Sequence, residues 1–152
     1  MADEPTAREP TAREPLAEET SGAALRRRAQ GAKADRLQAL LVSLDPGVGR
    51  WADEFVFGEV WGRPGLDFET RMLVAITSLA TQGQGALLRN YAHGALQAGI
   101  SARKIHEALV ELVVYAGFPT ATSMLFEWQQ VLAAARRQGL DIHEDVEEFA
   151  NI

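Results

Sequence analysis

Apolar residues recur at spacings of three and four along most of the chain, a pattern that predicts amphipathic helices. The pattern begins at Gly22, where an apolar stripe lies behind a basic run, residues 26–28, that we expect to face solvent. β-branched residues cluster only within residues 108–118, in a stretch too long between its flanking caps for one strand. We therefore predict an all-α fold. The leucines of the first stripe are Leu25, Leu37, Leu40, Leu41 and Leu44.

Capping residues and helix breakers divide the chain into six or seven expected helices. Asp45–Pro46 is typical of an N-cap followed by proline at the first helical position, and predicts a short helix through Trp51 and Phe55. Glycine and proline punctuate residues 57–66, which we expect to form a loop. Later helices are expected at 67–81, 86–98, 101–117 and 119–139, with Asp67 and Ser101 as N-caps.

The stretch from Ala108 to Phe118 is the most apolar helical segment and contains a single charged residue, Glu111. Such a density of apolar side chains predicts a helix that is buried on most of its circumference. Carboxylates are almost never fully buried unless they are paired or functional, so Glu111 is a candidate site residue. Gly117 and Pro119 end this helix and begin the next one.

Composition and charge narrow the classes of function. The 152-residue chain has a net charge of -6, which argues against nucleic-acid binding because phosphates require a basic face. It has no cysteine, which excludes disulfides, thiolate metal sites and dithiol redox chemistry. No apolar signal segment opens the sequence, and the longest uncharged run, residues 72–88, is too polar to span a bilayer. We expect a cytoplasmic protein that does not bind membranes.

Three regions are expected along the chain. Residues 1–21 contain a pentapeptide repeat that starts at Glu4, Glu9 and Glu14, and its regularly spaced prolines prevent a helix. Because this tail has few large apolar residues, we expect it to be disordered. Residues 22–140 are expected to form one helical domain, and residues 141–152 an acidic tail.

Four motifs occur together in an order and spacing typical of one protein family. They are GEVWGRPGL at 58–66, TRMLVAI at 70–76, ALQAGI at 95–100 and YAGFPTA at 115–121. Residues 57–132, half of the chain, resemble the carboxymuconolactone decarboxylase family. The resemblance implies an alkylhydroperoxidase D-like helical bundle, a homo-oligomer (dimer, trimer or hexamer), and decarboxylation of a small-molecule substrate without a cofactor.

The resemblance also bears on individual residues. Alkylhydroperoxidase D-like relatives carry Cys-x-x-Cys followed by a histidine, and Gln84 and Leu87 correspond to those cysteines, so dithiol peroxidase activity is excluded. Tyr91 occupies the position where family decarboxylases usually carry a histidine. Glu111 stands where members often carry histidine or glutamine, and Arg71 where the decarboxylases carry an arginine.

Glu111, Arg71 and Tyr91 are therefore the candidate catalytic residues. Desolvation would raise the pKa of the Glu111 carboxyl and make it an acid or base near neutral pH; the alternative is a structural carboxylate paired with an arginine. The Arg71 guanidinium is suited to clamp a substrate carboxylate, or to form a structural ion pair. The Tyr91 phenol is suited to donate to an enolate oxygen, or to be an ordinary core tyrosine.

Further candidates lie in the expected loop or near these three residues. Loops on rigid scaffolds often carry binding groups, although the loop tryptophan could equally anchor a second subunit. The histidine at 93 lies opposite Tyr91 on its helix, so a neighbouring subunit would have to bring it into the site. No pair of histidines has metal-ligand spacing, and no metal is expected. The substrate-binding candidates are Glu59, Trp61, Tyr115 and His93.

Three functional hypotheses remain open at this point. The first is a cofactor-independent acid–base enzyme that decarboxylates a carboxylated or polyoxygenated cyclic substrate through an enolate-like intermediate. The second is a tailoring enzyme for larger aromatic or polyketide-like molecules that catalyses cyclisation, isomerisation or cofactor-free oxygenation, since alanine and glycine near the site leave room for a bulky ligand. The third is a non-catalytic oligomeric binding protein.

Overall fold

The computed structural model describes residues 21–144, and within them every regular element is helical, which confirms the all-α prediction. Predictions for residues 1–20 and 145–152 lie outside the described part of the chain. None of the described helices is long and apolar enough to cross a membrane. The elements are α1 (Gly22–Gln30), a 3-10 turn η1 (Gly31–Lys33), α2 (Ala34–Leu44), α3 (Pro46–Trp51), a π-helix η2 (Ala52–Val60), α4 (Phe68–Thr81), α5 (Gly85–Gln97), α6 (Ala102–Tyr115) and α7 (Phe118–Arg137).

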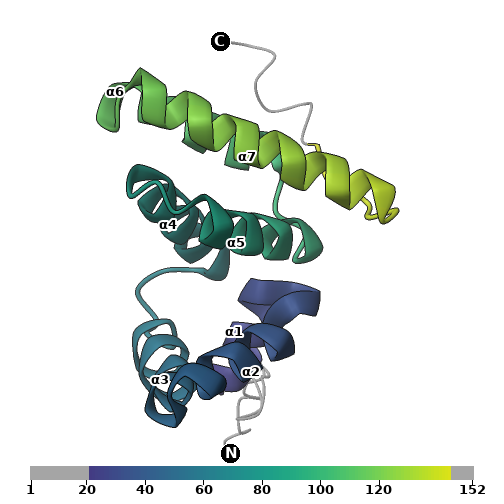
Figure 1. The fold of residues 1–152 in the computed structure, drawn as a ribbon. Coiled ribbons are helices and arrows are strands. Elements are labelled where there is room, and N and C mark those ends of the chain that lie inside the picture. Colours follow the sequence, from purple (N-terminus) through teal and green to yellow (C-terminus); the bar gives the residue numbers. More distant parts are fainter. Residues whose placement is uncertain (1–20, 145–152) are drawn as a thin grey trace, which may run out of the picture.

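The helices form three layers, which Figure 1 shows from bottom to top. The first layer contains α1, α2, α3 and η2; the second contains α4 and α5; the third contains α6 and α7. The middle pair packs against both neighbours, because α5 contacts α1 on one side and α7 on the other. The α4–α5 pair is therefore the central layer, with helices packed on both sides of it.

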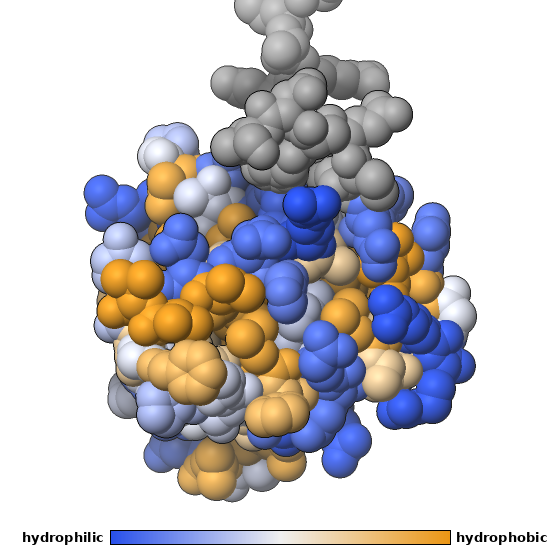
Figure 2. Space-filling view, turned by 90° about the horizontal axis from the view of Figure 1, so that it is seen from above, coloured by the Kyte–Doolittle hydropathy of each residue, from blue (hydrophilic) through white to orange (hydrophobic). Residues whose placement is uncertain are grey.

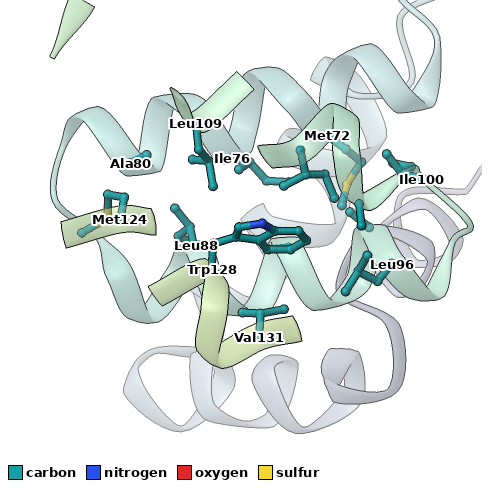
Figure 3. Packing of buried hydrophobic residues seen from close by; sticks show 14 of the residues in the cluster. Met72, Ile76, Ala80, Leu88, Leu96, Ile100, Leu109, Met124, Trp128 and Val131 are labelled. Carbon is teal, nitrogen blue, oxygen red and sulfur yellow. The ribbon is translucent and has the colours of Figure 1, made fainter. Parts of the chain in front are cut away.

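The hydrophobic core lies between the second and third layers and is centred on Trp128 of α7, which is fully buried. Met72 and Ile76 from α4, Leu88 from α5 and Leu109 from α6 surround its indole ring (Figure 3). These residues recur at the three- and four-residue spacings seen in the sequence, which is why each helix buries one face here.

The predicted caps begin the helices where the sequence placed them. The Asp45 carboxylate accepts from the Gly47 N–H at 2.6 Å and Pro46 follows it, while Asp67 accepts from the Thr70 N–H at 2.7 Å. Each bond satisfies one of the backbone donors that a helix leaves unpaired at its start. Ser101 caps α6 in the same way, through the N–H of residue 104.

Two expectations about the first layer are wrong. Residues 57–60 belong to the π-helix η2, so the predicted loop is reduced to the segment between η2 and α4. Arg26 does not face solvent: its side chain is 2% exposed, and its Nε donates to Asp53 Oδ1 at 2.6 Å. The three arginines of the basic run point in different directions around α1, and Arg26 is the one that faces inward.

The expectation that the apolar helix is buried on most of its circumference is also wrong. One face of α6 packs into the core through Ile105, Leu109 and Leu112, whereas Val114 and Tyr115 are 75% and 77% exposed. Figure 2 looks onto α6 and α7, and apolar surface gathers on this face. Glu111 is exposed rather than buried, so the chain by itself does not desolvate the carboxylate.

Candidate functional site

A cavity of about 820 Å³ lies between the first layer and the α4–α5 pair, and its walls come from α1, α2, α3, η2, α4 and α5. This volume is within the range of about 300–1,000 Å³ that is usual for small-molecule sites. Two aromatic residues of the lining, Trp51 and Phe55, are also exposed and so lie at its mouth. The apolar lining comprises Leu37, Leu40, Leu41, Val48, Trp51, Ala52, Phe55, Val56, Phe57, Trp61, Ala75, Leu79 and Leu87.

Four uncharged polar residues complete the wall: Gln30, Ser78, Asn90 and Tyr91. No charged side chain of the described residues lines this cavity. A ligand inside it would therefore meet apolar surface and a few neutral hydrogen-bonding groups. Such groups fix the orientation of a ligand while the apolar walls supply most of the binding free energy.

Tyr91 on α5 is the titratable group of this cavity. Burial raises the pKa of its phenol above the ordinary 10.0, and a hydrogen bond from the side chain of Gln30 opposes that rise. The phenol is therefore neutral at neutral pH and carries a proton that it can donate. The ring of Trp61 lies beside it, with the ring centroids 6.2 Å apart.

Trp61 is part of an aromatic group that joins the first layer to the second. Its ring centroid is 5.1 Å from that of Phe57 and 6.2 Å from that of Phe68. Offset contacts of this kind hold large apolar rings in fixed orientations. The structure thus brings two of the predicted site residues, Trp61 and Tyr91, into one cavity wall.

Arg71 lies next to this wall but does not line the cavity. Its guanidinium donates to the carbonyl of Val60 at 3.3 Å and to the carbonyl of Arg63. These contacts tie the segment that carries Trp61 to the start of α4. Glu59 is exposed on η2 and is not a lining residue of the cavity.

Glu111 and Tyr115 share a different surface, an open groove between α4 and α6 that also includes Thr77, Ser78 and Thr81. Glu111 and Tyr115 are four residues apart on α6, a spacing that puts two side chains on one face of a helix, and they line the same groove. Ser78 lines both the groove and the cavity, so the two hollows lie against neighbouring parts of α4. The catalytic role of Glu111 stays a prediction.

His93 faces away from Tyr91, as its position on the helix predicted. It is 4% exposed, and its Nε2 lies 2.8 Å from Oε1 of Gln138 on the residues that follow α7. It lines a small hollow between α5 and α7 rather than the main cavity. Within residues 21–144 no cluster of histidine, aspartate and glutamate side chains is able to hold a metal ion.

Comparison with known proteins places these features in a family. Residues 46–130, more than half of the chain, match the sequence pattern of the carboxymuconolactone decarboxylase family. The chain belongs to the carboxymuconolactone decarboxylase family. The resemblance of the motifs is thereby confirmed.

Three curated relatives match about half of the chain. A 4-carboxymuconolactone decarboxylase of Acinetobacter baylyi is 32% identical over 77 residues, which are 51% of this chain and 58% of that protein. The nitrosuccinic acid decarboxylase npaB of Metarhizium robertsii is 30% identical over 79 residues, 52% of this chain and 55% of that protein. An uncharacterised 15.0 kDa protein of Paracoccus denitrificans is 35% identical over 82 residues, 53% and 61% of the two chains. The chain thus spans little more than half the length of these relatives.

The family segment does not contain the whole cavity wall. Gln30 and the α2 leucines precede residue 46, and the motifs gave no indication that they would face Tyr91. The signal in the sequence was the leucine stripe itself, which we predicted to be the apolar side of amphipathic helices. Part of that stripe borders an open cavity, because helical periodicity reveals an apolar face without revealing what covers it.

Proposed function

We propose that this protein is a cofactor-independent acid–base enzyme of the decarboxylase type, with its reaction in the cavity that Tyr91 lines. The observation that carries the proposal is a neutral, partly buried phenol in an apolar cavity without a charged lining residue among those described. The family membership and two relatives named as decarboxylases support this reaction class.

The chemistry follows from the uncharged wall. In a substrate such as γ-carboxymuconolactone, whose carboxylate lies on the γ-carbon of an unsaturated lactone, the carbon–carbon bond to the carboxylate breaks and CO2 leaves. The electron pair moves onto the carbonyl, forming an enolate, and the Tyr91 O–H donates a hydrogen bond to its oxygen. A proton from water then adds to a carbon of the enolate, and the carbonyl forms again. A preorganised neutral donor is effective here because its position is already fixed when the charge develops on the oxygen.

Trp61 and Arg71 have supporting roles in this proposal. The Trp61 ring forms a flat apolar surface beside the phenol, against which a cyclic substrate packs. Arg71 holds the adjoining segment through two backbone carbonyls, so it keeps Trp61 in place.

Glu111 and Tyr115 enter the proposal through assembly of the chain into a homo-oligomer. The α6–α7 face carries exposed apolar side chains, among them Phe118 at 65% and Phe126 at 72%. A second copy on this face would cover the groove of Glu111 and desolvate its carboxylate, which burial in one chain does not achieve. Exposed apolar surface that gathers on one face often marks an interface with another protein chain.

A larger substrate is the second candidate, and the cavity volume favours it. About 820 Å³ exceeds what a single small lactone ring fills, and is suited to a polycyclic aromatic molecule. The same phenol would then stabilise the enolate formed when an acidic C–H is deprotonated during cyclisation or isomerisation. The two candidates share Tyr91 and differ in the carbon skeleton.

The first experiment is a turnover assay of the full-length protein with γ-carboxymuconolactone, following loss of the substrate. We expect Tyr91→Phe, which removes one oxygen, to abolish most turnover, and Ser123→Ala, an equally small change on the exposed side of α7, to leave it unchanged. Turnover that persists in Tyr91→Phe would refute the role of the phenol. No turnover by folded wild-type protein would favour the larger substrate, and the absence of turnover with polycyclic keto acids as well would leave the binding-protein hypothesis.

A further inference from the structure

Gln30, the last residue of α1, lines the same cavity as Tyr91, and its side-chain amide lies beside the phenol. It lines the cavity, is 8% exposed, and precedes the segment that matches the family. Its hydrogen bond lowers the pKa of the phenol, which is the effect expected of a donor to the phenol oxygen. A phenol oxygen that accepts from an amide keeps its own O–H free for another partner.

The backbone holds Gln30 rigidly in this position. α1 approaches α5 so closely at Gly94 that a Cβ there would lie 2.0 Å from the carbonyl oxygen of Ala29 and 3.1 Å from Cα of Gln30. Just beyond, the Ala32 N–H donates to Oε1 of Gln97 at 2.9 Å. Since Gly94 lies three residues after Tyr91 on α5, this close contact sets the amide beside the phenol.

The Gln30 amide is only partly satisfied by the described residues. Its Oε1 is buried and has no hydrogen-bond partner among the described residues. A buried acceptor without a partner lowers stability, and an apolar side chain of similar size would avoid that loss. Residues kept at a cost to stability are characteristic of functional sites, where activity requires a less stable arrangement.

We propose that Gln30 is the positioning residue of the site: its amide donates to the Tyr91 oxygen and directs the phenol O–H toward an acceptor oxygen of the substrate. The inference rests on the proposed function and names the group of the substrate that Tyr91 meets, a carbonyl or enolate oxygen on an otherwise apolar ring system. It also assigns a part of the site to the N-terminal helix, outside the family segment.

The test is the ionisation of Tyr91 in the full-length protein. The chain has two tyrosines, so a Tyr115→Phe background leaves Tyr91 as the only one, and its phenolate absorbs near 295 nm. Stopped-flow pH jumps record the ionisation before alkaline unfolding. In this background we compare Gln30, Gln30→Leu and Gln30→Met, with Gln97→Leu as the matched control that breaks only the bond to Ala32.

We expect both Gln30 variants to ionise at higher pH than the parent, because burial then acts without the opposing hydrogen bond. The stability of both Gln30 variants in urea should equal or exceed that of the parent. The control Gln97→Leu should be less stable than the parent, and the ionisation of Tyr91 in it should be unchanged. Unchanged ionisation in both Gln30 variants, or a loss of stability without a shift, would overturn the proposal. Persistent turnover in Tyr91→Phe would instead refute the proposed function. It would not affect the conclusion that the ionisation experiment gives on the Gln30–Tyr91 contact.

Discussion

Removal of the Asp53 carboxylate is the sharpest test of how the first layer is held together. Arg26 is buried, and its guanidinium has three oxygen contacts: Asp53 at 2.6 Å, the Ala34 carbonyl at 2.7 Å and Asp35 at 3.9 Å. Asp53 also accepts from Gln38 of α2 at 3.3 Å, so one carboxylate joins η2 to both α1 and α2. Asp53→Ala therefore leaves a buried cation with only partial compensation.

The expected magnitude follows from that geometry. Breaking a buried ion pair by removing one partner costs about 3–5 kcal/mol. The Ala34 carbonyl remains and the Asp53 side chain is 29% exposed, so we expect a loss of about 2–3 kcal/mol. For a domain of this size that corresponds to a fall in melting temperature of about 5–10 °C.

Urea and thermal unfolding followed by circular dichroism measure this loss. Asp53→Asn, which keeps an acceptor without the charge, should fall between wild type and Asp53→Ala. Arg26→Met combined with Asp53→Leu removes both charges and should recover most of the stability. A loss below about 1 kcal/mol in Asp53→Ala, or a double variant as unstable as the sum of its single changes, would refute the reasoning.

Three further predictions follow from single residues. Burial raises the pKa of the Tyr91 phenol above 10.0 in the folded protein. The neutral phenol therefore contributes its full stability below pH 10.0, and this contribution is lost as pH rises toward the folded pKa. Tyr91→Phe should reduce the decline of the melting temperature at alkaline pH. The Thr70 hydrogen bonds lower the pKa of Asp67 below 3.8, so the stability difference between wild type and Asp67→Ala should be full above pH 3.8 and shrink as pH falls through the folded pKa. In urea unfolding, Ile76→Ala should cost about 2–5 kcal/mol, and Val74→Ala on the exposed side of α4 less than about 1 kcal/mol; equal losses would contradict the core shown in Figure 3.

Most helix boundaries could be predicted because they depend on local chemistry. Asp45, Asp67 and Ser101 cap helices through bonds to backbone groups two or three residues away, and such contacts are encoded within a few positions. The π-helix η2 could not be predicted in this way. It continues α3 through Gly58, a residue type that usually signals a turn, and a Cβ at this glycine would lie 3.0 Å from the Asp53 carbonyl oxygen.

The error at α6 has a physical cause. Periodicity and apolar density record how many apolar faces a helix has, but not whether its own chain covers them. Val110 and Val113, which suggested a deeply buried helix, are 38% and 37% exposed, while Leu109 and Leu112 are in the core. A helix that buries one face internally and offers another to a second copy has the same sequence signature as a helix buried throughout.

The site was predictable only where the family motifs reach. Trp61 and Tyr91 lie within the matched segment, and both line the cavity. Gln30 was not predicted as a site residue. No local sequence feature distinguishes a polar residue that points into a cavity from one that ends a surface helix. Its role depends on the close approach of α1 to Gly94, which is a contact between residues more than sixty positions apart in the sequence.

The absence of a charged group among the described lining residues constrains the chemistry as strongly as the presence of Tyr91. A carboxylate that enters such a cavity loses hydration and gains no cation, so its localised charge is poorly stabilised. As CO2 leaves, that charge spreads onto the carbonyl oxygen, where a neutral phenol meets it. An arginine clamp in the wall would stabilise the carboxylate before the reaction as well as the charge that develops during it, and uniform binding of that kind does not lower the barrier. The position of Arg71 outside the cavity, bound to backbone carbonyls, is therefore consistent with catalysis by the apolar wall and Tyr91.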